Sequence, residues 1–162
     1  MRLLSVVRHA KSDWNDPTLS DAERPLNARG QRDAPAMGQR LAAEECRPDL
    51  MVSSPATRAM QTATLLATEL GYPPEAIVQV DVIYEASLGT LQSVVESLPD
   101  NATHVMLIGH NPGFESLCNY IDPDQPVVMT TCNVAQYELD IESWSAFDMG
   151  CGERYFHYTP KD

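Results

Sequence analysis

Long apolar runs, basic residues and paired cysteines are all scarce in this sequence. No apolar run approaches the ~18–20 residues that cross a bilayer, and the first run, residues 3–7, is too short for a signal peptide. Lysine and arginine number 11 against 23 aspartate and glutamate residues, so the net charge is −12. This acidity argues against nucleic acid and membranes as partners, and an anionic substrate would need a locally positive pocket.

The cysteine content excludes a disulfide framework. No C-x-x-C pair occurs among the four cysteines, Cys46, Cys118, Cys132 and Cys151. We therefore expect reduced thiols and a cytoplasmic protein. A zinc site built from cysteines and histidines is the alternative, but no two such ligands form a close pair in the sequence. This spacing disfavours a zinc site. We also expect no other metal and no cofactor.

The length and the apolar pattern favour an α/β fold in one domain, residues 1–162. Hydrophobic residues make up 43% and charged residues 21% of the 162, which is typical of a globular domain. Predicted strands alternate with predicted helices, which favours a mostly parallel central sheet with helices on both faces. One of the last two strands could run antiparallel. The predicted strands are 3–7, 50–53, 77–80, 105–108, 135–141 and 154–158, and the predicted helices are 27–43, 57–70, 90–98 and 114–121.

Turn and capping residues predict where two of the helices begin and end. Asn27 is a good N-cap for the first helix, although Pro35 predicts a kink or a later start. Ser54-Pro55 reads as the N-cap and first position of the second helix, and Gly71 as its stop.

Two histidines follow predicted strands directly. His9 comes after the strand 3–7, next to Arg8, and His110 comes after the strand 105–108. Ligands collect outside the carboxyl ends of strands in open α/β sheets, so we expect these side chains to share a pocket. A histidine there can be a nucleophile, a base or a metal ligand. No motif surrounds His104 or His157, which we interpret as structural.

Arg58 suggests that the pocket binds phosphate. It lies in the first turn of the predicted helix 57–70, where free N–H groups and the helix dipole favour anions. A guanidinium adds paired donors that suit phosphate. The alternative is an ordinary surface arginine.

Three motifs in order resemble the histidine phosphatase superfamily. They are Arg8-His9-Ala10-Lys11-Ser12, the segment 53–63 around Arg58, and Gly109-His110-Asn111-Pro112-Gly113. Within the superfamily the chain most resembles the SixA-type phosphohistidine phosphatases, because of the Arg8–Ser12 version of the first motif and of Asp21-x-x-Arg24-Pro25-Leu26-Asn27-x-x-Gly30. The resemblance implies a phosphoglycerate-mutase-like fold.

The resemblance also implies a metal-independent mechanism. His9 would be the nucleophile that takes the phosphoryl group, while Arg8, Arg58 and His110 would surround the phosphate oxygens. Phosphoryl transfer needs mainly positioning and charge neutralisation, which these groups can supply. We expect His9 to be neutral and His110 to be charged beside bound phosphate.

Four further residues are weaker candidates for phosphate or substrate binding. Ser12 and Asn15 could donate hydrogen bonds to phosphate, or could satisfy their own turns instead. Lys11 and Arg24 could enlarge the positive pocket or contact a substrate protein.

Glu85 is the candidate general acid. The segment 83–89 fits the Leu-x-Glu-x-x-x-Gly spacing of the phosphoglycerate-mutase-like branch, in which this Glu fills that role. Glu85 could equally be a solvated loop carboxylate. A phosphohistidine leaves as an imidazole with a pKa near ~6.5, which solvent can protonate, whereas an alkoxide needs a positioned acid.

The resulting hypothesis is a phosphohydrolase that acts through phospho-His9 on phosphohistidine in a protein. One alternative is a phosphatase of small phosphate monoesters with Glu85 as general acid. Another is a non-catalytic phosphoprotein-binding module. A nucleotide-binding domain is disfavoured, because neither G-x-G-x-x-G nor a P-loop follows a strand.

Overall fold

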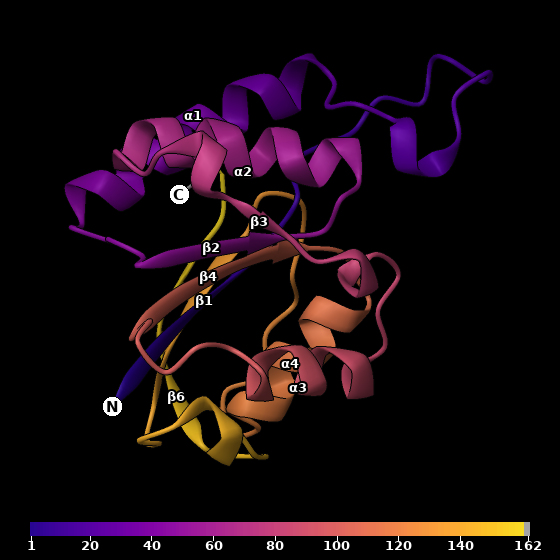
Figure 1. The fold of residues 1–162 in the computed structure, drawn as a ribbon. Helices are drawn as coiled ribbons and strands as arrows, with labels where there is room; N and C mark the ends of the chain where they lie inside the picture. The colour runs from indigo at the N-terminus through magenta and orange to yellow at the C-terminus, as the bar shows by residue number, and fades with distance from the viewer. Residues whose placement is uncertain (161–162) are drawn as a thin grey trace.

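A twisted sheet with helices on both faces forms the centre of the molecule (Figure 1), as described for residues 1–160 by a computed structural model. Six strands lie in the order β3-β2-β4-β1-β5-β6 within these residues. Their bounds are β1 (Arg2–Arg8), β2 (Leu50–Ser53), β3 (Val78–Gln79), β4 (His104–Gly109), β5 (Val134–Leu139) and β6 (Gly152–Tyr158).

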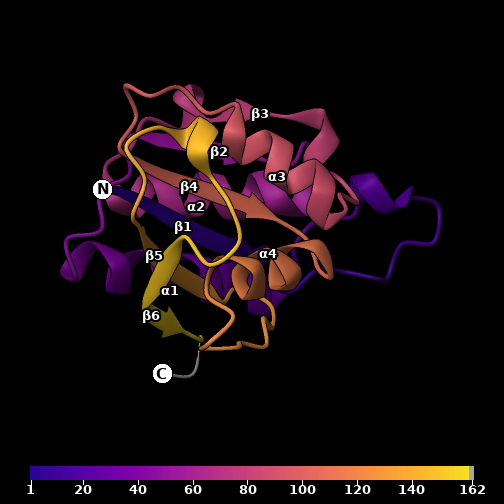
Figure 2. The same ribbon diagram turned by 90° about the horizontal axis from the view of Figure 1, so that it is seen from below.

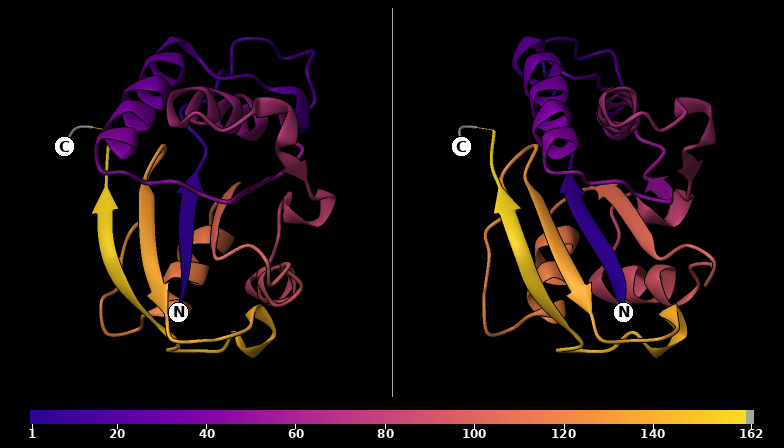
Figure 3. Two further views of the ribbon diagram at one scale, coloured as in Figure 1. Left: turned by 60° about the vertical axis from the view of Figure 1, so that its left-hand side comes forward. Right: turned by 90° about the vertical axis from the view of Figure 1, so that its left-hand side faces the viewer.

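The strand directions confirm the predicted fold class. β1, β2, β3 and β4 pair in parallel, whereas β5 is antiparallel to both of its neighbours. Figure 3 shows β5 running against β1 and β6. One of the last two strands is therefore reversed, as the sequence suggested.

Two helices cover each face of the sheet. α1 (Ala28–Ala43) and α2 (Thr57–Leu70) pack on one face, and α3 (Leu88–Glu96) and α4 (Gly113–Ile121) on the other, which Figure 2 shows in front of the sheet. Because both faces are covered, β4 is buried along its whole length. Met106 packs in the core under α1 and α2, and Leu107 in the opposite core. No helix in the described part is long and apolar enough to cross a bilayer.

The start of α1 follows its capping signal. The side chain of Asn27 accepts a hydrogen bond from the Gly30 amide, as expected of an N-cap. The helix contains Pro35, so the alternative of a later start is wrong. Pro35 has no N–H, so one hydrogen bond is missing inside α1. The helix nevertheless begins before Pro35, because the Asn27 cap fixes its first turn.

The start of α2 differs from the prediction. The helix begins at Thr57 with Ala56 as N-cap, so the assignment of Ser54 as N-cap and Pro55 as first helical residue is wrong. The Ser54 hydroxyl instead accepts a hydrogen bond from the Ala56 amide and contacts His110. Gly71 ends the helix with a φ of 72°, in the left-handed conformation predicted for it.

The register of three parallel strands brings their carboxyl ends to one edge of the sheet. Arg8 pairs with Gly109, and Ser53 pairs with Ile108. One residue further, the His9 amide donates to the Gly109 carbonyl and the Ser54 amide to that of Ile108, both at 3.0 Å. The chain therefore leaves β1, β2 and β4 at the same edge, on the right of Figure 1.

The segment after His9 lies directly on the first turn of α1. The Asn27 amide donates to the Lys11 carbonyl oxygen at 3.0 Å. A Cβ added to Gly30 would lie 2.2 Å from that same oxygen. Only glycine permits this approach, so Gly30 fixes where the loop after His9 runs.

We predict that Gly30→Ala lowers the free energy of unfolding by about 1–3 kcal/mol, because the added methyl group overlaps a backbone oxygen. Urea unfolding measures this change. Gly89→Ala is the matched control, since Gly89 also lies in a first helical turn and its Cβ would meet nothing closer than 3.9 Å. Equal stability changes in the two variants would show that the contact at Gly30 is unimportant.

Candidate active site

His9 is buried and its ring is held in one tautomer. The side chain is 7% exposed, and ring nitrogen Nδ1 lies 2.7 Å from the carbonyl oxygen of Ala10. A carbonyl can only accept, so Nδ1 carries the proton and Nε2 keeps a free electron pair. Burial lowers the pKa of His9 to about 3, and the charges of His110, Arg58 and Arg8 act in the same direction. His9 is therefore neutral at pH 7, as a nucleophile requires.

His110 lies beside His9 and is fixed from two sides. The two ring centroids are 5.1 Å apart. Nε2 of His110 lies 2.7 Å from the Ser54 hydroxyl, and the Tyr84 ring contacts His110 edge-on at 5.5 Å between centroids. Because Ser54 Oγ already accepts from the Ala56 amide, its own proton can go to Nε2 of His110. Nδ1 then carries the only proton of the neutral ring, whereas in the charged ring Nε2 would donate to Ser54 Oγ instead.

The charge state of His110 depends on what lies beside it. Burial lowers its pKa to about 4, with Arg58 and Arg8 adding to the shift and Asp21 opposing it. The protein's own groups thus favour a neutral ring. The charged form expected beside phosphate requires the negative charge of the anion, and it stays a prediction.

Two guanidinium groups complete the cluster. Arg58 is 6% exposed. Both of its terminal nitrogens donate hydrogen bonds to Asp21, one to the main-chain oxygen at 2.7 Å and one to Oδ2 at 3.0 Å. Arg8 donates from Nη1 to the Met129 carbonyl at 3.0 Å. Burial lowers the pKa of Arg8. Each guanidinium is thus anchored at its tip.

Three buried donors of this cluster have no partner among the described residues. They are Arg8 Nε, Arg58 Nε and His110 Nδ1. Each unsatisfied buried donor costs about 1–3 kcal/mol, so such groups call for an explanation. Oxyanion oxygens are strong acceptors for donors of this kind. The cluster therefore combines two guanidinium groups and unpaired donors with a neutral imidazole, which suits an anion such as phosphate.

Asp21 is a site residue that the sequence analysis did not identify as one. Its Oδ1 accepts from Arg24 at 3.2 and 3.0 Å, and its Oδ2 accepts from Arg58 and from the Tyr84 hydroxyl. The Tyr84 hydrogen bond, followed by those from the two arginines, holds the pKa of Asp21 far below its usual range. The only signal in the sequence is the Asp21-x-x-Arg24 spacing, which carried the family resemblance but no assigned role.

The four weaker candidates lie in different surroundings. Ser12 and Arg24 contact each other, with Ser12 Oγ accepting from Arg24 Nη1 at 2.9 Å, and both are buried. Lys11 and Asn15 are exposed. The backbone N–H of Asn15 donates to the side-chain carboxylate of Asp13, two residues earlier in the same turn. The structure therefore links Arg24 and Ser12 to the site through Asp21. The roles of all four in binding stay predictions.

Glu85 directly follows the site residue Tyr84 in the sequence. Its side chain is exposed, and its backbone adopts a φ of 54°, in the left-handed region. The neighbouring residue, Tyr84, is the one that contacts His110. Its role as general acid stays a prediction.

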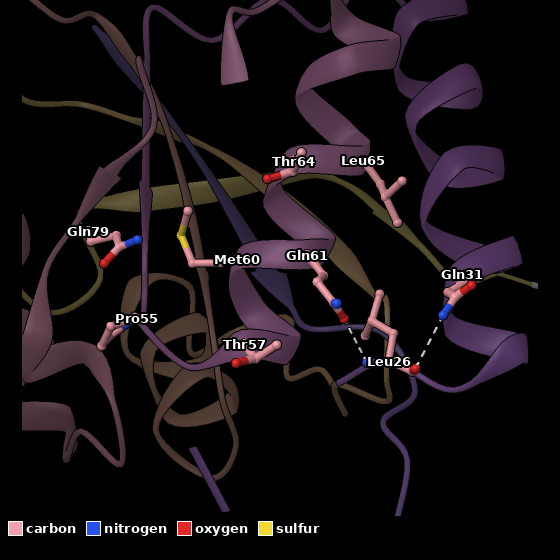
Figure 4. A pocket seen from close by; sticks show the side chains of 9 residues that line it. All are labelled: Leu26, Gln31, Pro55, Thr57, Met60, Gln61, Thr64, Leu65 and Gln79. Atoms are coloured by element: carbon pink, nitrogen blue, oxygen red, sulfur yellow. Dashed lines mark hydrogen bonds between the residues drawn. The ribbon is translucent and has the colours of Figure 1, made fainter. Parts of the chain in front are cut away.

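A cavity of about 540 Å³ lies beside the first turns of α2, separate from the histidines. Only uncharged side chains line it, among them Leu26, Met60 and Gln61 (Figure 4). Gln61 accepts from the Leu26 amide at 2.8 Å. This cavity lacks the charge that phosphate needs. Among residues 1–160, no group of three or more His, Cys, Asp or Glu side chains is arranged to hold a metal ion.

Comparison with known proteins identifies the family. The family model of the histidine phosphatase superfamily (branch 1) matches residues 4–111. An uncharacterized chloroplastic protein of Arabidopsis thaliana is 31% identical over 152 residues, which cover 88% of this chain and 69% of the relative. The chain therefore belongs to the histidine phosphatase superfamily.

Solved structures agree with this membership. SixA of Agrobacterium tumefaciens superposes with a TM-score of 0.83 at 25% identity, covering 98% of both chains. The protein histidine phosphatase SixA complexed with tungstate has the same fold, with a TM-score of 0.83 at 22% identity over 98% of this chain and 97% of that one. The predicted SixA-type resemblance is confirmed, and the findings support phosphatase activity.

We predict that Ser54→Ala lowers kcat about tenfold, because it removes the hydroxyl that orients the His110 ring, an interaction of about 1–2 kcal/mol. Steady-state hydrolysis of a phosphorylated substrate measures the effect. Ser53→Ala is the control, since the Ser53 hydroxyl is also buried but bonds to the Ser54 carbonyl at 2.9 Å. Similar kcat values in the two variants would contradict the role of Ser54.

The histidine pKa values also predict how stability depends on pH. The folded pKa of His9, about 3, and that of His110, about 4, lie below the ~6.5 of an unfolded histidine. The unfolded chain binds more protons, so stability falls as the pH drops below ~6.5, by about 1–2 kcal/mol per histidine at pH ~5. Urea unfolding of the wild type and of His9→Asn, each at pH ~6.5 and at pH ~5, measures this loss of stability. The prediction is wrong if the variant loses as much stability on acidification as the wild type.

Proposed function

We propose that the protein removes the phosphoryl group from phosphohistidine in a protein substrate, through a covalent intermediate on His9. The observation that carries this proposal is the neutral His9 ring with Nε2 unprotonated, next to three buried donors without partners. A neutral nucleophile beside an oxyanion cradle is what phosphoryl transfer to nitrogen needs.

The reaction has two displacements. In the first, Nε2 of His9 attacks phosphorus and forms an N–P bond, while the bond to the substrate imidazole breaks. Solvent protonates the other ring nitrogen of the substrate phosphohistidine before this bond breaks, so that the leaving group is a neutral imidazole, whose conjugate acid has a pKa of ~6.5. In the second, water attacks the phosphorus of phospho-His9, the N–P bond breaks and phosphate leaves, with a water proton passing to bulk solvent. Arg8, Arg58 and His110 neutralise the charge on the equatorial oxygens throughout.

The substrate class rests on relatives as well as on geometry. One structural neighbour is described as a protein histidine phosphatase and was solved with tungstate, an oxyanion of phosphate-like shape. In this chain, Lys11 and Asn15 are exposed and would contact the substrate protein, while Ser12 and Arg24 would support the pocket from behind Asp21. The proposed site of action is the cytoplasm, although the Arabidopsis relative is chloroplastic.

A phosphatase of small monoesters is the second candidate. Glu85 favours it, because it directly follows Tyr84, which contacts His110. An alkoxide leaving group needs a proton donor, and Glu85 would supply that proton. A non-catalytic phosphoprotein-binding module is the third possibility, and it would form no phosphoenzyme.

The test compares a phosphohistidine protein with an alkyl phosphate as substrates for the wild type, His9→Ala and Glu85→Gln. We expect His9→Ala to lose at least about 10³-fold in kcat, because covalent catalysis is removed. We expect Glu85→Gln to keep phosphohistidine hydrolysis, and to lose any ester hydrolysis about 10²-fold.

Rapid acid-free quenching with labelled substrate should trap a phosphoenzyme in the wild type that is stable to base and labile to acid. Near-normal turnover by His9→Ala would overturn the mechanism. Binding of the phosphoprotein with no turnover and no phosphoenzyme would identify a binding module instead.

A further inference from the structure

We propose that Asp21 is the positioning residue of this site, which orients Arg58 directly and His110 through Tyr84 without itself contacting the substrate. The proposal rests on the function proposed above. Its basis is that one carboxylate joins three side chains from separate segments of the chain: Arg24 of its own loop, Arg58 of α2 and Tyr84 before α3.

The direct effect is on Arg58. Both terminal nitrogens of the guanidinium bond to Asp21, one to the main-chain oxygen at 2.7 Å and one to Oδ2 at 3.0 Å. A guanidinium is planar, so fixing its two terminal nitrogens also fixes the direction of its Nε–H. That Nε is one of the three buried donors without a partner. Asp21 therefore determines where Arg58 presents its hydrogen bond.

The indirect effect is on His110. The Tyr84 hydroxyl donates to Oδ2 of Asp21, and the Tyr84 ring meets the His110 ring at 89°, with 5.5 Å between centroids. The Ser54 hydroxyl holds His110 from its Nε2 side. The His110 ring is thus held by the Ser54 hydrogen bond and by the perpendicular Tyr84 ring. The position of the Tyr84 ring depends on its hydrogen bond to Asp21.

Asp21 is itself held in place. Arg24 makes two hydrogen bonds to Oδ1, donates to Ser12 and stacks on the Trp14 ring at 3.3 Å from its centroid. Arg24 is buried, although the side chain of Asp21 is 43% exposed. The carboxylate at the rim of the site is therefore fixed by a buried arginine, and it cannot turn away without breaking that pair.

If Asp21 is neutralised, a positioning role and a purely electrostatic role predict opposite changes in phosphate affinity. A carboxylate near a phosphate site repels the anion, so a residue that acted only through its charge would weaken phosphate binding. Neutralising such a residue would tighten binding. A positioning residue has the reverse signature, because its loss releases Arg58 and weakens binding. Asp21 is also no proton donor, since its pKa lies far below the working range.

Calorimetric binding of inorganic phosphate and of tungstate to the full chain tests the proposal without requiring turnover. We expect Asp21→Asn to weaken binding about tenfold, the size of one oriented hydrogen bond. The matched control is Asp16→Asn in the same loop, whose carboxylate bonds to Thr18 and should leave affinity unchanged. In an Arg58→Ala background, the Asp21→Asn effect should shrink to about threefold, because only the path through Tyr84 and His110 then remains.

Unchanged or tighter binding by Asp21→Asn would overturn the proposal, as would an undiminished effect in the Arg58→Ala background. If Asp21→Asn does not fold, Tyr84→Phe removes only the hydroxyl that bonds to Asp21. It should weaken tungstate binding by about threefold, and full affinity in this variant would overturn the indirect arm. A wild type that binds phosphate but hydrolyses no phosphohistidine would refute the proposed function alone, since these binding measurements would still decide the role of Asp21.

Discussion

The common register of β1, β2 and β4 is the constraint on which the rest of the site depends. Because Arg8 pairs with Gly109 and Ser53 with Ile108, three strands end at one edge of the sheet. Each delivers its next residue there: His9, Ser54 and His110. A slip of one residue in any of these pairings would turn the strand's side chains to the opposite face and separate the two histidines. The packing of helices on both faces therefore fixes the geometry of the chemistry.

The site concentrates positive charge in a chain whose net charge is −12. Arg8 and Arg58 lie near the two imidazoles, and their charges together with burial lower both histidine pKa values. A neutral His9 follows from this arrangement without any dedicated base. The buried donors without partners are a cost to stability, and bound phosphate would offset it. Asp21 balances part of the arginine charge and fixes its direction.

Periodicity and turn chemistry predicted most of the fold. The continuous apolar strands and the helical spacing around Asn27 and Gly71 placed the main elements within a few residues. The errors are local. β3 is confined to Val78–Gln79, and α2 has the predicted bounds 57–70 but is capped by Ala56 instead of Ser54. Ser54 has a good capping side chain, but its hydroxyl is used by a histidine 56 residues away, which no local rule includes.

The site was predictable only where it lies at strand ends and in motifs. The structure brings Arg8, His9, Arg58 and His110 together, as the sequence suggested. Asp21 and Tyr84 were missed because their hydrogen bonds join distant parts of the chain. Asp21 bonds to Arg58, 37 residues away, and to Tyr84, 63 residues away. Such contacts follow from the tertiary fold and leave no periodic signal. Glu85 was identified from motif spacing alone, and its role as general acid stays a prediction, although the structure shows that the residue is exposed.

The central claim is that His9 is held as a neutral ring with its proton on Nδ1, which leaves Nε2 to attack phosphorus. A long-range ¹H–¹⁵N NMR spectrum of the histidine side chains at pH ~6, assigned with His9→Asn, tests it most directly. Because Nδ1 bonds to the Ala10 carbonyl and the pKa is about 3, we predict a neutral His9 with a protonated Nδ1 and an unprotonated Nε2. A doubly protonated ring, or a neutral ring with its proton on Nε2, would contradict the account.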